Sequence, residues 1–75
     1  MSDMVEISKL GRNKQAQLVT VEIATGPDFG HEVILDAKTG IKILESHTRG
    51  IKVRVIDGPY APHSLVLPSD TIVLA

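Results

Sequence analysis

The 75-residue chain contains no cysteine and no tryptophan, and it has one phenylalanine and one tyrosine. The absence of cysteine excludes disulfides and most structural zinc sites. A domain of this length buries a small share of its surface and commonly depends on disulfides, a metal or oligomerisation. We therefore expect oligomerisation to supply the buried surface that a single chain lacks. The chain also lacks a signal-peptide pattern and an apolar run that could span a bilayer, so we expect one cytoplasmic domain, residues 1–75, without a membrane partner.

The charge of the chain is unevenly distributed, although the formal net charge is only −1. The segment 37–54 holds five bases and one acid, a balance of +4, so the remaining residues carry −5. The bases are Lys38, Lys42, Arg49, Lys52 and Arg54, and the acid is Glu45. This local excess of positive charge keeps a polyanionic partner open.

Apolar and polar residues alternate along 18–23 and along 51–55, which is the period of two expected of half-buried strands. Segments rich in Val and Ile, separated by Gly, Pro and Asp, predict further strands at 32–36, 41–45, 65–67 and 71–74. Residues 3–10 fit either a capped helix or a strand, and we favour the strand. The pattern therefore predicts an all-β fold, a small sandwich or barrel.

The connections between these segments resemble hairpin turns. Residues 36–40 and 47–50 both end in a glycine that can adopt positive φ, which predicts a three-strand meander through the middle of the chain. The segment 65–75 is the most apolar part of the chain. An apolar edge strand promotes aggregation unless it is covered, so we expect a neighbouring subunit to cover this segment.

Three bases are predicted to share one face of this sheet. If the 47–50 hairpin pairs Glu45 with Ile51, Lys42 lies directly opposite Arg54, and Lys52 lies two residues along on the same face. Like charges in opposite positions destabilise a sheet, whereas such a surface suits phosphates and the edge of guanine. The alternative is a solvated outer face of an amphipathic sheet.

The sequence offers little evidence for catalysis or metal binding. His31, His47 and His63 each lack a second ligand at metal-site spacing, so no metal is expected. No nucleophile elbow, P-loop or dinucleotide fingerprint occurs, so we expect neither an enzyme nor a cofactor. With two aromatic residues, RNA binding would need a design other than a stacking platform. The glycine-punctuated segment 25–31 is either a ligand-contacting loop or a wide turn.

Four segments, in order, carry a family resemblance. Ser-Asp-Met-Val-Glu-Ile at 2–7 is similar to Ser-Asp-Phe-Val-Val-Ile, and Gly-Pro-Asp at 26–28 to Gly-Thr-Asp. Leu35-Asp36 precedes the hairpin glycine Gly40. The most specific match is His-Thr-Arg-Gly-Ile-Lys-Val-Arg at 47–54, which is similar to His-Thr-Ser-Ala-Ile-Lys-Val-Arg. Up to Arg54 the chain thus resembles the trp RNA-binding attenuation protein.

The resemblance implies a β-sandwich subunit whose sheets continue between subunits in a closed homo-oligomeric ring. It implies that L-tryptophan binds between subunits and that single-stranded RNA with spaced G/U-A-G triplets wraps around the rim. Lys52 and Arg54 match the family's RNA-contacting Lys-x-Arg pair. A further family lysine is replaced by Ile34, and Lys42 and Lys38 are the bases that could take its place. The implied ligand residues are Thr25, Gly26 and Asp28, in a loop that lacks two of the family's threonine hydroxyls, and His47 and Thr48 in a partner loop.

We therefore expect a ring-forming, RNA-binding regulator of transcription attenuation or translation, responsive to an amino acid and without a DNA partner. The alternative is a structural or protein-interaction ring of the same fold with no RNA role. A very small oligomeric enzyme is a third, less favoured hypothesis.

Overall fold

The computed structural model describes residues 3–26 and 31–75, and it confirms an all-β fold. Within these residues no helix is long and apolar enough to cross a membrane. A single turn of 3-10 helix, η1 (Ile7–Lys9), accompanies the strands. The strands are β1 (Met4–Glu6), β2 (Gln15–Leu18), β3 (Glu22–Gly26), β4 (His31–Leu35), β5 (Gly40–His47), β6 (Gly50–Val55), β7 (Ser64–Leu67) and β8 (Ile72–Leu74).

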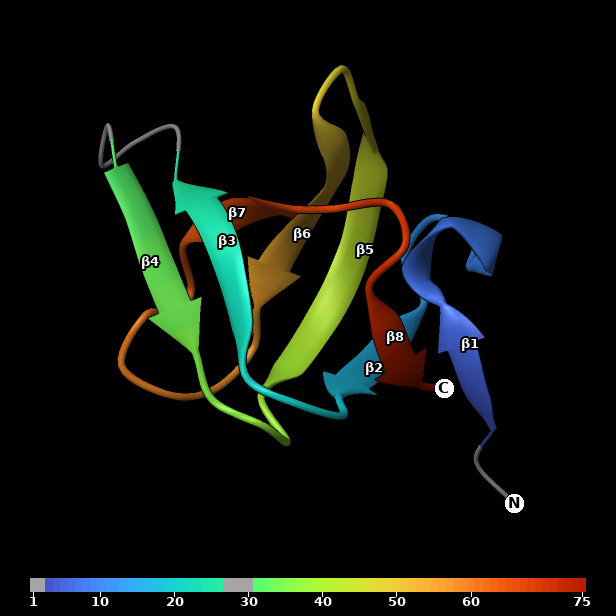
Figure 1. The fold of residues 1–75 in the computed structure, drawn as a ribbon, viewed down its shortest axis with the longest axis horizontal. Coiled ribbons are helices and arrows are strands. Elements are labelled where there is room, and N and C mark those ends of the chain that lie inside the picture. Colours follow the sequence, from blue (N-terminus) through green and yellow to red (C-terminus); the bar gives the residue numbers. More distant parts are fainter. Residues whose placement is uncertain (1–2, 27–30) are drawn as a thin grey trace.

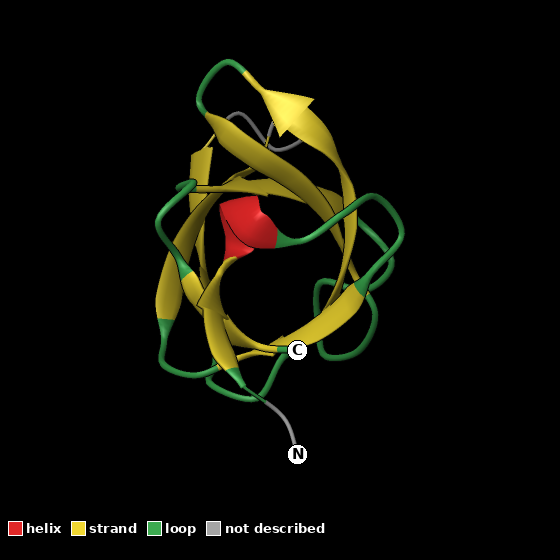
Figure 2. Cartoon of the chain, turned by 90° about the vertical axis from the view of Figure 1, so that its right-hand side faces the viewer, coloured by secondary structure: helices red, strands yellow, loops and turns green. Residues whose placement is uncertain are grey.

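The strands form one antiparallel sheet in the order β1-β8-β2-β5-β6-β7-β3-β4, not the two stacked sheets of a sandwich. The sheet curls on itself. Its two edge strands, β4 and β1, lie at opposite sides of Figure 1. Figure 2 shows the strands surrounding an interior, and η1 lies over its centre at the end that faces the viewer, which is the right-hand end of Figure 1. The backbone N–H of Ile7 donates to the carbonyl of Thr71 at 2.7 Å, which ties η1 to the segment before β8.

The core fills the inside of this curled sheet. Alternate residues of each strand point inward, which places the apolar positions of the period-two pattern in one cluster. The most deeply buried large side chains are Ile7, Leu18, Ile41, Leu65, Leu67, Val53, Val55 and Val73. They come from η1 and from five different strands, so the interior depends on nearly the whole length of the chain.

Two predictions about neighbouring strands are wrong. The segments 32–36, 41–45 and 51–55 do not form a meander, because β4 lies at the edge of the sheet while β5 pairs with β2 and β6. The C-terminal strand β8 is not an edge strand, since it pairs with both β1 and β2. The chain itself covers its apolar C-terminus. The edges that remain are β1 and β4.

Three element boundaries also differ from the prediction. The expected strand at 18–23 is divided, because β2 ends at Leu18 and the chain bends before β3 begins at Glu22 on the other side of the sheet. The segment 3–10 contains a short strand followed by η1. Strand β2 was not predicted, because Gln-Ala-Gln-Leu offers only a weak apolar alternation. The loop predicted at 25–31 falls partly in β3 and β4, and its centre lies outside the described residues.

The hairpin between β5 and β6 needs a glycine directly after its two turn residues, at the first position of β6. Gly50 has φ of 151°, and a Cβ built there would lie 2.1 Å from the carbonyl oxygen of Leu67. Any side chain would collide with the neighbouring strand β7. In the turn before β5 the positive φ falls on Lys38 at 71°, and not on Gly40 as predicted.

Candidate nucleic-acid interface

The predicted opposition of Lys42 and Arg54 is confirmed, but the register around it is not the predicted one. Lys42 on β5 pairs with Arg54 on β6, and Glu45 pairs with Lys52, not with Ile51. The ladder shifts between Ile43 and Glu45, where Leu44 has no partner on β6. This β-bulge lies between the hairpin turn and Lys42, and its one-residue shift places Lys42 opposite Arg54, whereas the register of the turn alone would place Lys42 opposite Val55.

The outward face carries two rows of side chains that run across the strands. The first row crosses β2, β5, β6 and β7 through Gln15, Lys42, Arg54 and Ser64. The second crosses β5, β6, β7, β3 and β4 through Glu45, Lys52, Val66, Thr25 and Glu32. We call the surface formed by Lys42, Lys52 and Arg54 the cationic face. Because Ile41, Ile43, Val53 and Val55 alternate with these residues and are buried, the cationic face points away from the core.

The charges of the cationic face are not neutralised by any acid in the part of the chain that the structure describes. Among the described residues no acid lies within ion-pair distance of Lys42, Lys52 or Arg54. The acid nearest in the register, Glu45, instead forms an ion pair with Arg12 at 3.8 Å. Arg54 is exposed, and Lys42 and Lys52 are half-buried. The sheet thus holds two like charges in directly opposed positions, an arrangement that is unfavourable without a counter-charge.

Lys38 does not belong to these rows. It is exposed in the turn between β4 and β5, where its backbone N–H donates to the carbonyl of Leu18 at 2.8 Å. It lies four residues before Lys42, beyond the start of β5 and at the far side of the first row from Lys52. A polyanion would have to extend past the first row to reach it.

The residues predicted to hold a small ligand are not brought together in one chain. Thr25 and Gly26 lie at the end of β3, and His47 and Thr48 lie at the β5–β6 hairpin, with β6 and β7 between them. At about 4.8 Å per strand, β3 and β5 are about 14 Å apart. Both segments point to the same end of the sheet in Figure 1. The backbone N–H of Arg49 donates to Nδ1 of His47 at 3.1 Å. Asp28 lies outside the described residues.

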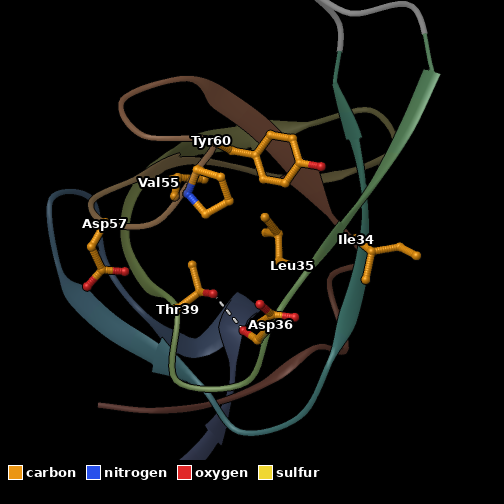
Figure 3. Close-up of a pocket in the computed structure, with 8 residues that line it drawn as sticks. Ile34, Leu35, Asp36, Thr39, Val55, Asp57 and Tyr60 are labelled. Carbon is orange, nitrogen blue, oxygen red and sulfur yellow. Dashed lines mark hydrogen bonds between the residues drawn. The ribbon is translucent and has the colours of Figure 1, made fainter.

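A small hollow lies on the other side of the molecule, between the β4–β5 turn and the segment after β6 (Figure 3). Its empty space is about 220 Å³, and the figure shows the Ile34 side chain pointing away from its centre. Thr39 Oγ1 donates to the carbonyl of Asp36 at 2.6 Å, and Asp57 accepts a bond from the Gly40 N–H at 3.0 Å. The lining is Ile34, Leu35, Asp36, Thr39, Val55, Asp57, Pro59 and Tyr60, none of which was a predicted ligand residue.

A second, wider hollow adjoins the β-bulge. It contains about 580 Å³ of empty space and is lined by Ser8, Leu10, Arg12, Ile43, Leu44, Glu45, Ser46 and Ile51. Sequence reasoning overlooked Arg12 and Gln15. The Lys and Arg content of 9–14 was the available signal, but nothing local indicates that this segment lies beside β5. Within the described part of the chain, no three His, Asp or Glu side chains gather as a metal site requires.

Comparison with protein-family models, with curated proteins and with solved structures found no match. The resemblance to the trp RNA-binding attenuation protein therefore rests on the matched residues of the chain, chiefly 47–54.

Proposed function

We propose that the chain is an RNA-binding regulatory subunit that contacts single-stranded RNA through the cationic face. The observation that carries the proposal is the direct opposition of Lys42 and Arg54, with Lys52 beside them and no described acid paired to any of the three. A polyanion supplies the counter-charge that this arrangement lacks. The resemblance at 47–54 supports the same conclusion, because Lys52 and Arg54 match the family's Lys-x-Arg pair.

The cationic face differs in its chemistry from the common single-strand RNA modules. Those modules stack bases on aromatic side chains, whereas the two rows contain none: they hold lysine, arginine, glutamine, serine and threonine together with Glu45, Glu32 and the buried Val66. Affinity would then come mainly from phosphate contacts, with base preference supplied by bidentate bonding of Arg54 to guanine. Such binding is weak for one subunit. Repetition of the face around a homo-oligomeric ring would raise the total affinity by multivalency.

The proposal includes the ring and its effector. Both edges of the curled sheet are open to another chain, so the sheet can continue from one subunit into the next. A ligand site made by Thr25 and Gly26 of one subunit and His47 and Thr48 of another is consistent with their separation in one chain. L-tryptophan is the effector that the family resemblance suggests.

The test is RNA binding as a function of salt. We expect a single-stranded RNA of G/U-A-G repeats to bind more tightly than a scrambled RNA, with a linear fall of log affinity with log salt concentration. Arg54→Ala should cost about 1 to 3 kcal/mol at each engaged site and relax base preference, and Lys52→Ala should weaken both RNAs alike. Lys9→Ala, an exposed lysine on η1, is the matched control. Equal weak binding of the wild type and of both variants to both RNAs would reject the proposal.

A second candidate is an assembly module without an RNA role. The observation that favours it is the position of the exposed large apolar side chains, most of which lie on the two strands nearest each sheet edge. They are Val21, Ile23 and Ile34 beside or within β3 and β4, and Met4 and Ile72 on β1 and β8. A stable oligomer that does not bind RNA would support this candidate. A folded monomer in native mass spectrometry at micromolar concentration would reject it.

A further inference from the structure

Arg12 is anchored to the β-bulge that separates the two rows of the cationic face. Its Nε donates to the carbonyl oxygen of Leu44 at 3.1 Å, and its Nη2 lies 3.8 Å from Oε2 of Glu45. Leu44 is the bulged residue, which has no partner on β6. A bulge leaves backbone groups without hydrogen-bond partners in the ladder. The guanidinium of Arg12 is the partner of one such group, the carbonyl of Leu44. The same contact brings a positive charge to Glu45.

Glu45 has two cations within reach and is paired with one of them. Lys52 is its direct cross-strand neighbour, and the Cβ atoms of such neighbours lie about 4.5 to 5.5 Å apart, close enough for an ion pair. Yet the ion pair that Glu45 makes among the described residues is with Arg12, and Lys52 has no acidic partner there. The side chains of Arg12 and Glu45 are 72% and 55% exposed, so the Glu45 carboxylate is free to turn towards Lys52 when Arg12 is removed.

We infer that Arg12 is a positioning residue of the cationic face, which holds the Glu45 carboxylate away from Lys52 and so leaves Lys52 available to a phosphate. This inference rests on the proposed RNA function. It explains how Glu45 can lie beside Lys52 in the second row without neutralising the charge of that lysine. Without Arg12, the nearest cation for Glu45 is Lys52. The internal pair would then compete with the RNA phosphate for the lysine.

A double-mutant cycle of Arg12→Ala and Glu45→Gln tests the inference by fluorescence anisotropy with a G/U-A-G repeat RNA. One single-strand phosphate contact contributes about fivefold to affinity at 0.1 M salt, so Arg12→Ala alone should weaken binding by about that factor and reduce the salt slope by about 0.7. In the Glu45→Gln background the same change should alter affinity by no more than about twofold. Lys14→Ala, which removes a charge two residues away, controls for net charge and should behave as the wild type.

Equal loss of affinity in both backgrounds would overturn the inference, because Arg12 would then contact RNA itself or act only through the fold. Melting temperatures of all variants identify a general loss of structure. If the wild-type protein binds no RNA, the proposed function is rejected. The contact of Glu45 with Lys52 is then tested by NMR in the absence of RNA. The side-chain NMR signals of Lys52 should shift in Arg12→Ala and return in Arg12→Ala/Glu45→Gln, and signals that stay unchanged would overturn it.

Discussion

Ile23 and Ile34 lie directly opposite each other on β3 and β4, on the outer face of the sheet, with 56% and 61% of their surfaces exposed. The strand that carries Ile34 is an edge strand. Two β-branched side chains on an open edge form a surface to which another strand can pair. This edge leaves apolar surface exposed, as Met4 and Ile72 do on β1 and β8 at the other edge.

Replacing Ile34 with glutamine should therefore shift the assembly towards monomers. The side chain is mostly exposed in one chain, so the change should alter monomer stability by less than about 0.5 kcal/mol. Sedimentation velocity or native mass spectrometry would measure the shift. Ile56→Gln is the control, because Ile56 is 45% exposed but belongs to neither edge strand: its backbone N–H donates to the carbonyl of Gly40 at the start of β5. The same loss of oligomer in both variants would mean that β4 is not the interface.

Replacing Lys42 with glutamine should stabilise the free protein and weaken RNA binding. The change removes one of two like charges held opposite each other, which is worth about 0.2 to 1 kcal/mol. For a domain of this size, that corresponds to a rise in melting temperature of about 1 to 8 °C. Calorimetry in the absence of RNA would measure it, with Lys9→Gln as the control. A melting temperature that falls would show that Lys42 stabilises the sheet.

Replacing Gly50 with alanine should be severely destabilising. The added Cβ would meet the carbonyl oxygen of Leu67 at 2.1 Å, and φ of 151° is unfavourable for a residue with a side chain. We expect a loss of more than about 2 kcal/mol in urea unfolding. Gly11→Ala is the matched control, because nothing lies within 4 Å of its added Cβ. Similar losses in both variants would contradict the close approach of β6 to β7.

Tryptophan should raise the melting temperature of the assembled protein if the proposed effector site exists. Stabilisation by mass action reaches about 2.7 kcal/mol at a ligand concentration of one hundred times the Kd. Thr48→Ala should reduce the shift, since Thr48 is one of the ligand residues on the β5–β6 hairpin. Differential scanning fluorimetry would measure both. An unchanged melting temperature at millimolar tryptophan would mean that this chain does not bind the family's effector.

Much of the cationic face could be predicted from the sequence. The alternation along 51–55 separates inward Val53 and Val55 from outward Lys52 and Arg54, but the opposition of Lys42 and Arg54 also depends on a bulge, because the register of the 47–50 turn alone would place Lys42 opposite Val55. The bulge at Leu44 could not be predicted, because it depends on the segment around Arg12 that pairs with β5. The sequence does not show that two strands, β6 and β7, lie between Thr25 and Gly26 on β3 and the predicted ligand residues of the β5–β6 hairpin.

The sequence by itself determined that this chain is all-β, and which side of each predicted strand is apolar, because a period of two is a property of local backbone geometry. Only the tertiary structure decided which strands are neighbours. An apolar strand has the same local pattern whether it lies at an edge or between two others, so β8 seemed exposed and β4 seemed central. Strand order is set by long-range pairing around the common core, in which Ile7 and Val73 meet residues far away in the sequence. The same pairing places Arg12 beside Glu45 and leaves Lys52 without an acidic partner among the described residues.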